Sequence, residues 1–197
     1  MVIRLILASK SAARREMLTG AGVAFEVRVA DVDEDAVKAG FDPAQAADLA
    51  QELARVKALA VSRAEPDAWV LGGDQTLAFD GALVSKARGL DQARARLSAM
   101  RGRVHHLHSG AALAKGGQVV WSGVDTAAMH VRDFSDGFLD AYLAAEGEGL
   151  LASVGSYRLE GMGAQLFERI EGDYFTVLGL PLWAVLDQSR RHGIIAA

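Results

Sequence analysis

VIRLILASKSAARREML, residues 2–18, passes from a strand pattern directly into a helix pattern. The mainly apolar run over residues 2–8 predicts a buried strand. Ser11 then takes the N-cap position of a helix expected over residues 12–21. A strand that leads into a helix after a few residues is the building unit of α/β folds, so this stretch indicates the fold class.

The junction between this strand and this helix gathers groups that suit a phosphate. Backbone N–H groups and the positive end of the helix dipole point toward the hydroxyls of Ser9 and Ser11. Arg14 shares a helix face with Met17 and Leu18, and its side chain is directed back toward the same helix end. The plain alternative is a capping serine beside a solvated arginine, because strand–serine–helix junctions are common.

The rest of the chain alternates helix and strand patterns and then turns to hairpins. We expect helices over residues 43–63, 91–100, 135–145 and 181–192. We expect strands over residues 25–29, 69–72, 75–79, 82–84, 104–114, 118–131, 166–170 and 175–177, and a loop over residues 31–35. No repeat or linker divides the sequence, so residues 1–197 are expected to form one α/β domain with a mixed sheet flanked by helices.

Composition excludes several classes of function. The sequence has no cysteine, which rules out disulfides, thiol catalysis and cysteine-ligated zinc. Its net charge of −4 and its lack of a basic run argue against a surface for duplex nucleic acid. No apolar run in the sequence reaches the roughly 18–20 residues that cross a membrane. We therefore expect a cytoplasmic enzyme or binding protein without nucleic-acid or membrane partners, and its oligomeric state is left open, a homodimer included.

Four charged residues stand where catalysis or binding would use them. Asp74 follows two glycines at the end of a buried strand, where α/β enzymes place catalytic groups, although a turn aspartate fits equally well. Lys57 borders the apolar stripe of its helix, which also suits a snorkelling lysine. Lys86 follows a hairpin and says little alone. Glu160 stands in a glycine-flanked loop, where it would either contact a base edge or remain plain surface.

Familiar nucleotide and metal motifs are poorly matched. The sequence has no Walker phosphate loop, and its nearest approach to G-x-G-x-x-G, at residues 161–163, lacks the third glycine. His105, His106 and His108 invite a metal hypothesis, but no carboxylate stands at a matching spacing nearby. The acidic run over residues 31–35 lacks the EF-hand pattern. We favour a structural role for the histidines and a solvated loop for the acidic run.

Read together, these pieces resemble the Maf family of nucleotide pyrophosphatases over essentially the whole chain. That family opens with a strand followed by S-x-S-P-R-R-x-E-L-L, and here SKSAARREML occupies residues 9–18. The family's later motifs are matched, in order, by VDE at 32–34, the lysine at 57, GGDQ at 72–75, SKA at 85–87, RGRVH at 101–105, GSY at 155–157 with EG at 160–161, and GLP at 179–181. Each match is weak, but eight in the right order form a specific signal.

The resemblance implies a fold and a reaction. The fold would be an elongated mixed sheet flanked by helices, bilobed with a central cleft, as in Maf and inosine-triphosphatase-like proteins. The reaction would be hydrolysis of a nucleoside triphosphate to the monophosphate and pyrophosphate. A divalent cation, Mg²⁺ or Mn²⁺, is implied as cofactor, with Glu34 and Asp74 as its carboxylate ligands. Asp74 would also orient and deprotonate the attacking water.

The resemblance also assigns roles to residues that contact the phosphates. Ser9, Ser11 and Arg14 would hold phosphate oxygens. Lys57 and Lys86 would offset the negative charge that develops as the phosphate chain is cut. These residue types agree with the chemistry, because a polyphosphate needs a local cluster of hydroxyls and cations.

The substrate is less well defined. Ala13, Gln75 and Glu160 stand at positions that the resemblance links to base recognition. Gln75 and Glu160 resemble the branch acting on 7-methyl-GTP, and a carboxylate accepts both donors of the guanine edge. Ala13 matches neither that branch, which carries a bulky aromatic residue there, nor the dTTP and UTP branch, which carries arginine. We expect a 7-methyl-GTP pyrophosphatase, with a dTTP/UTP pyrophosphatase and a non-catalytic nucleotide-binding regulator of cell division as alternatives.

Overall fold

The strands of the chain form one mixed sheet. The computed structural model describes residues 3–197, so Val2 of the expected first strand lies outside the described residues. The strands are β1 (Leu5–Ala8), β2 (Glu26–Val27), β3 (Trp69–Phe79), β4 (Ala82–Val84), β5 (Val104–Lys115), β6 (Gln118–Val131) and β7 (Phe167–Glu171). Their order is β2-β1-β3-β5-β6-β7, and β4 also pairs with β3. Because β1 runs parallel to β2 and β3 while the other pairs are antiparallel, the predicted mixed α/β sheet is confirmed.

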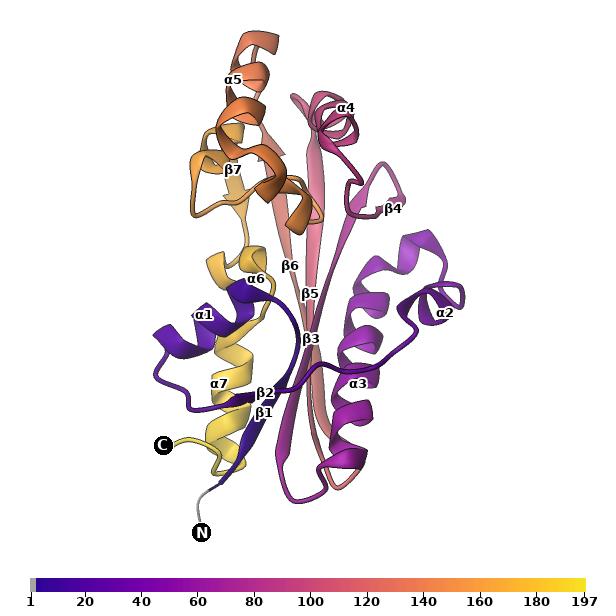
Figure 1. Ribbon diagram of the computed structural model, residues 1–197, viewed down its shortest axis with the longest axis vertical. Helices are drawn as coiled ribbons and strands as arrows, with labels where there is room; N and C mark the ends of the chain where they lie inside the picture. Colours follow the sequence, from indigo (N-terminus) through magenta and orange to yellow (C-terminus); the bar gives the residue numbers. More distant parts are fainter. Residues whose placement is uncertain (1–2) are drawn as a thin grey trace.

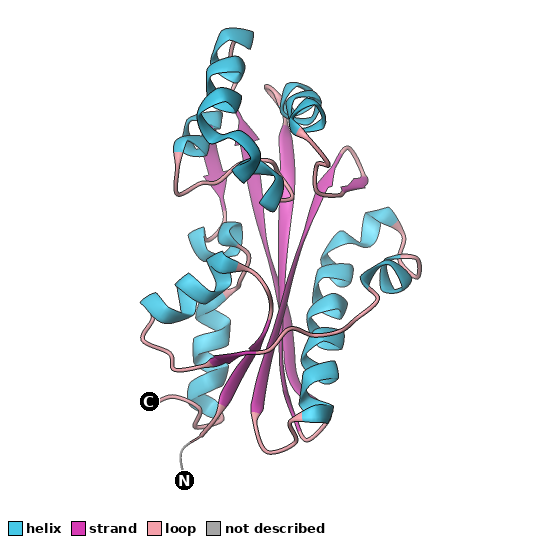
Figure 2. Ribbon diagram, in the orientation of Figure 1, coloured by secondary structure: helices cyan, strands magenta, loops and turns pink. Residues whose placement is uncertain are grey.

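Helices flank this sheet on both sides (Figures 1 and 2). They are α1 (Ala12–Gly20), α2 (Glu34–Lys38), α3 (Ala46–Ala64), α4 (Leu90–Met100), α5 (Asp136–Glu146), α6 (Tyr174–Leu178) and α7 (Leu182–Arg191), with 3-10 turns η1 (Pro43–Gln45), η2 (Gly147–Ala152) and η3 (Met162–Leu166). The molecule is elongated along β3, β5 and β6, with α3 on one side and α1, α6 and α7 on the other (Figure 1). Within residues 3–197, no helix has both the length and the apolar character that a membrane crossing would require.

The core is divided among the faces and the far end of the sheet. On the side of α1 and α7, alternate residues of the strands bury large aliphatic side chains, such as Leu7 and Leu71, against Leu18 and Val185. A second cluster fills the far end of the sheet, where aromatic side chains including Phe134 pack beneath α4 and α5. This division follows from the two-residue period of a strand, which sends neighbouring side chains to opposite faces.

On the remaining face, α3 lies against the sheet almost backbone to backbone. Several of its buried positions are alanines, and Ala50, Ala54 and Ala58 are fully buried. They lie over Gly72 of β3 and Gly110 of β5: a Cβ added to Gly72 would be 2.1 Å from the carbonyl oxygen of Ala54. The same atom added to Gly110 would be 2.2 Å from the carbonyl oxygen of Ala50. The glycines are therefore needed because the helix backbone occupies the space of a side chain.

This contact predicts that Gly110→Ala destabilises the fold. The added methyl meets a backbone carbonyl that cannot rotate away, so we expect the free energy of unfolding to fall by about 1–3 kcal/mol or more. Urea unfolding monitored by circular dichroism would measure it. Gly20→Ala is the matched control, because a Cβ at Gly20 meets nothing within 4 Å. Equal stabilities of the two variants would contradict the close approach.

Two predicted elements are wrong. The acidic segment 31–35, expected as a loop, enters the short helix α2, because the side chain of Asp33 accepts from the backbone N–H of Ala36 and caps it. The expected strand 175–177 is the helix α6. It begins with a cap by Asp173, whose carboxylate accepts from Thr176 N, and ends at Gly179, whose φ of 109° lies in the left-handed region.

Other boundaries shift for identifiable reasons. The expected strands 69–72 and 75–79 are one strand, β3, because β5 pairs along it from Val70 to Ala78 without a break. The predicted 25–29 strand narrows to two residues that pair with β1. The helix expected from residue 43 begins with the turn η1, closed by a capping box between Asp42 and Gln45, before α3. The bilobed cleft stays a prediction.

Candidate active site

The sheet has an open stretch of edge beside the end of β1. Strand β1 pairs with β3 only as far as Ala8 opposite Gly72, and β4 pairs with β3 only from Leu77 onward. Among the described residues, no strand covers residues 73–76 on this edge. At the same point the chain leaves β1 and enters α1, so the helix N-terminus lies beside the uncovered part of β3. Ligands of α/β sheets commonly bind at such a place, outside the carboxyl end of a parallel strand.

A lysine joins two carboxylates next to this edge. The Nζ of Lys57 donates to Oδ1 of Asp74 at 2.5 Å and lies 2.7 Å from Oε1 of Glu34. The side chains of Lys57 and Asp74 are 13% and 14% exposed and that of Glu34 is 42% exposed, so the cluster opens to solvent on the Glu34 side. Three separate elements, α3, β3 and α2, supply these residues.

The charges of this cluster favour an ionised Glu34. Its partial burial opposes ionisation, but the hydrogen bond and positive charge of Lys57, helped by Lys38 and Lys86, lower the pKa of Glu34 below its ordinary value. Lys86 is exposed beyond β4 and acts on the cluster through its charge. The structure therefore brings together Glu34, Lys57 and Asp74 in direct contact and places Lys86 within electrostatic reach.

The loop after β1 is held by Arg14. The Nη1 of Arg14 donates to Oγ of Ser9 at 2.9 Å, and its Nε donates to the carbonyl oxygen of Gly179 at 2.7 Å. Ser11 caps the helix as expected, its Oγ accepting from the backbone N–H of Arg14. Burial lowers the pKa of Arg14, and the negative charges of Asp74 and Glu34 oppose this shift. A buried guanidinium is thus fixed by Ser9 and Gly179, within electrostatic reach of the two carboxylates.

Gln75 points to the opposite face of β3 from Asp74. Its Nε2 donates to the carbonyl oxygens of Thr176 and Val177, at 3.1 and 3.0 Å, and to Oγ of Ser109 at 3.1 Å. Ser109 Oγ itself donates to Thr176 O at 2.7 Å. The structure therefore ties Gln75 to the backbone of α6, and the predicted contact of Gln75 with substrate stays a prediction.

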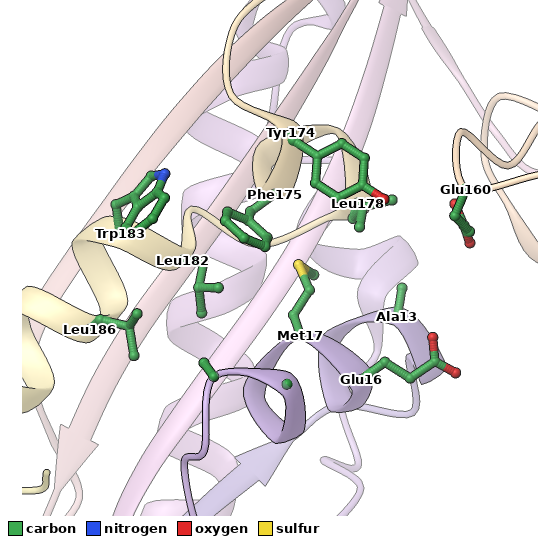
Figure 3. Close-up of a pocket in the computed structure, with 12 residues that line it drawn as sticks. Ala13, Glu16, Met17, Glu160, Tyr174, Phe175, Leu178, Leu182, Trp183 and Leu186 are labelled. Atoms are coloured by element: carbon green, nitrogen blue, oxygen red, sulfur yellow. The ribbon is translucent and has the colours of Figure 1, made fainter. Parts of the chain in front are cut away.

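Ala13 and Glu160, far apart in the sequence, line one pocket between α1 and the segment α6–α7 (Figure 3). The pocket has a volume of about 570 Å³, and most of its lining is aliphatic or aromatic. Among the described residues that line it, the only charged side chains are Glu16 and Glu160. The Nε of Arg158 lies 3.4 Å from Glu160 and leaves that carboxylate only partly paired.

A family model described as Maf-like protein matches residues 4–191. The chain belongs to the Maf-like family. It is 53% identical over 192 residues to a nucleoside triphosphate pyrophosphatase of Granulibacter bethesdensis, covering 96% of this chain and 98% of the relative. It is 50% identical to a nucleoside triphosphate pyrophosphatase of Maricaulis maris and 48% identical to a 7-methyl-GTP pyrophosphatase of Rhizobium meliloti, each covering 98% of both chains. These relatives confirm the expectation of a hydrolase.

Two polar residues of the pocket in this Maf-like chain, Glu16 and Tyr174, are not among the site residues predicted from the sequence. Glu16 lies one turn after Ala13 on α1, so helical spacing alone could have pointed to it. Tyr174 opens α6, which was expected as a strand beginning one residue later. The signal that could have found it is Asp173, a cap residue placed three positions before Thr176.

The histidines of this Maf-like chain make protein contacts. His105 is fully buried, and its Nε2 lies 2.6 Å from the hydroxyl of Tyr157. Burial, with a smaller contribution from the charge of His106, lowers the pKa of His105 to about 3, so the ring stays neutral at physiological pH. The rings of His106 and His108 stack with centroids 6.3 Å apart. Within residues 3–197, no group of three or more His, Cys, Asp or Glu gathers as a metal site would require.

Proposed function

We propose that this chain hydrolyses the bond between the α and β phosphates of a nucleoside triphosphate, with 7-methyl-GTP as its preferred substrate. The observation that carries the reaction is the contact of Lys57 with both Asp74 and Glu34 beside the uncovered edge of β3. The names of the relatives support the same reaction, and one of them names 7-methyl-GTP. The base preference rests on the acidic pocket that holds Ala13 and Glu160.

The site has the parts that cutting a phosphate chain requires. Asp74 would orient the attacking water and take its proton, because its carboxylate is held by Lys57 at the open edge. Lys57 and Lys86 would offset the charge that develops on the leaving pyrophosphate. Ser9, with Ser11 and Arg14, would hold phosphate oxygens at the N-terminus of α1. The water oxygen would form a bond to phosphorus as the bridging P–O bond between the α and β phosphates breaks, which yields the monophosphate and pyrophosphate.

The same cluster fits a divalent cation, Mg²⁺ or Mn²⁺. Asp74 and Glu34 hold carboxylate oxygens around a single Lys57 nitrogen, and such oxygens are ligands that hard cations prefer. No third acidic or histidine side chain joins them among residues 3–197. This suits Mg²⁺, which commonly takes one or two carboxylates and completes its shell with substrate phosphates and water. A bound cation would supply further neutralisation of phosphate charge.

The pocket favours a guanine base that carries a positive charge. The Watson–Crick edge of guanine presents two adjacent donors, N1–H and the N2 amino group, and the carboxylate of Glu160 can accept both. Methylation at N7 gives the ring a positive charge. The second acid of the pocket, Glu16, would also attract that charge. Uracil and thymine present one donor between two acceptors, which an amide side chain would suit better.

A pyrophosphate-release screen tests this proposal. The chain, supplied with Mg²⁺ or Mn²⁺, is offered canonical and methylated nucleoside triphosphates at equal concentrations. We expect the highest kcat/KM with 7-methyl-GTP. Preference for dTTP or UTP would contradict the proposed substrate, and no release from any triphosphate would contradict the reaction and favour a binding protein.

Glu160→Gln is expected to change base preference. The amide keeps one acceptor but loses the charge and the second acceptor, so kcat/KM for 7-methyl-GTP should fall by about 10–100-fold. The kcat/KM values for UTP and dTTP should not fall with it. Glu148→Gln is the control, an exposed acid of η2 outside the pocket, and should change neither value by more than about twofold. An equal fall in kcat/KM for all substrates would show that Glu160 does not recognise the base.

A further inference from the structure

Tyr174 lines the pocket of Ala13 and Glu160 with a half-exposed ring. The residue is 49% exposed, and its only described aromatic contact is an edge-on packing against Phe175, with ring centroids 5.7 Å apart. A ring of this size on the wall of a pocket leaves a large apolar face without a partner. In Figure 3 the ring of Tyr174 stands over the pocket with Ala13 and Glu160 on one side and Trp183 on the other.

The helix that carries Tyr174 is fixed by polar contacts. Asp173 caps it, and the Oγ1 of Thr176 lies 3.3 Å from Oδ2 of Asp125 on β6. Gln75 of β3 and Ser109 of β5 donate hydrogen bonds to carbonyl oxygens of this helix. A five-residue helix held in this way presents its first side chain in a defined place, which is what binding a flat ligand requires.

The end of α6 is also connected to the phosphate loop. The carbonyl oxygen of Gly179, directly after α6, accepts from Nε of Arg14, and the same guanidinium donates to Ser9. The ring of Tyr174 is therefore positioned relative to the side chains proposed to hold the phosphates. Ser9 lies just before α1 and Ala13 lies in its first turn, so the proposed phosphate site and the pocket share the N-terminal end of one helix.

The chemistry of the pocket supports a planar base between α1 and Tyr174. Ala13 has only a methyl group, so the α1 wall offers no ring and leaves room for one. Glu160 can accept hydrogen bonds from the edge of the base while an aromatic ring stacks on the face of the base. A cationic base gains more from such a contact than a neutral one, because the face of an aromatic ring carries negative charge.

We infer that Tyr174 is a substrate-binding residue that stacks on the base and favours a cationic one. This inference rests on the proposed function, because it assumes that the pocket holds the base of the nucleotide. It assigns Tyr174 to ground-state binding, so its loss should raise KM while kcat changes little.

The test compares Tyr174→Leu, Tyr174→Gln and Tyr174→Phe, each checked for folding by circular dichroism. For 7-methyl-GTP we expect the Leu and Gln variants to raise KM by about tenfold or more, with kcat within about threefold of the original protein. The Phe variant should restore KM to within about twofold, because it keeps the ring. The preference for 7-methyl-GTP over GTP should also fall in the Leu and Gln variants.

Val120→Gln is the control, because Val120 is an exposed apolar side chain of β6 that lies outside the pocket. We expect it to leave KM within about twofold. Unchanged KM in Tyr174→Leu and Tyr174→Gln would overturn the inference, as would an equal rise of KM in Val120→Gln.

A second measurement separates this inference from the proposed reaction. Calorimetric binding of 7-methyl-GMP reports on the base pocket without turnover. In one outcome, the original protein releases no pyrophosphate yet binds 7-methyl-GMP, and that binding is lost in Tyr174→Leu. This outcome would contradict the proposed reaction and support the stacking role. If turnover is normal and 7-methyl-GMP binds both proteins equally, the stacking role fails and the reaction stands.

Discussion

Asp74→Asn should lower kcat for 7-methyl-GTP by about 10²–10⁴-fold, the range that loss of a positioned general base produces. The asparagine fills the same space but cannot take a proton from water. In the absence of added Mg²⁺ or Mn²⁺, substrate binding should be retained or strengthened, because a negative charge is removed from beside a polyphosphate. Pyrophosphate release gives kcat, and calorimetry with a non-hydrolysable α,β-methylene triphosphate gives the dissociation constant.

Asp80→Asn is the control for this experiment. Asp80 ends the same strand at the hairpin turn, where its φ of 52° is well tolerated by asparagine. Its kcat should stay within about twofold of the original value. An Asp74→Asn enzyme with more than a tenth of the original kcat would assign the proton transfer to another group, and Glu34 would be the next candidate.

Lys57→Met is the second change with a large expected effect. It removes the cation that contacts both Asp74 and Glu34, so we expect kcat to fall on the order of 10²–10³-fold. The variant should also lose about 1–3 kcal/mol of unfolding free energy, less than a fully buried pair would cost, because Glu34 remains 42% exposed. Lys38→Met is the control: Lys38 lies 3.9 Å from Glu34 but is itself 41% exposed. It should keep near-original kcat.

The stability loss of Lys57→Met should depend on pH. In the original protein the pKa of Glu34 is lowered, so its ionisation stabilises the fold above the ordinary carboxyl pKa and this contribution is lost as pH falls. Without Lys57, burial dominates and raises that pKa, so ionised Glu34 becomes a cost near neutral pH. The difference in unfolding free energy between the two proteins should therefore shrink from pH 7 to pH 4. A constant difference would show that Lys57 does not stabilise the charge of Glu34.

The regular elements could be predicted wherever local signals and tertiary packing agree. The helix start at residue 43 and the apolar stripe that follows it predicted α3, and the apolar run over residues 2–8 predicted β1. The prediction failed at α6, because Phe175, Thr176 and Val177 are aromatic or β-branched residues, which favour strands. Its carbonyl contacts with Gln75 and Ser109 come from distant strands, which no local pattern contains.

The two glycines before Asp74 show a different limit. The expected strands 69–72 and 75–79 are interrupted at this point, yet β3 continues through both glycines. Gly72 is required because α3 lies against it, and a single sequence does not say which neighbour approaches a glycine. Likewise, the acidic run over residues 31–35 was expected as a solvated loop, although it enters α2 and Glu34 contacts Lys57.

The site itself was predicted from the order of motifs more than from any one residue. Lys57 and Asp74 come from a helix and a strand whose contact depends on the long packing of α3, so their 2.5 Å separation could not be derived from spacing. The pocket joins residues that are even farther apart in the sequence, because Glu160 and α6 come after most of the strands of the sheet. Its acidic character and the place of Tyr174 became visible only in three dimensions.

The backbone contact of α3 with Gly72 and Gly110 bears on how this protein could diversify. A larger side chain along that contact would meet the backbone of α3, so few substitutions are tolerated there. The position of the Lys57–Asp74 pair is therefore expected to change little during evolution. The wall formed by α1 and α6 is built of side chains, and those can be exchanged one at a time. Proteins that descend from such an ancestor can therefore come to act on other nucleotides while they keep the same phosphate chemistry.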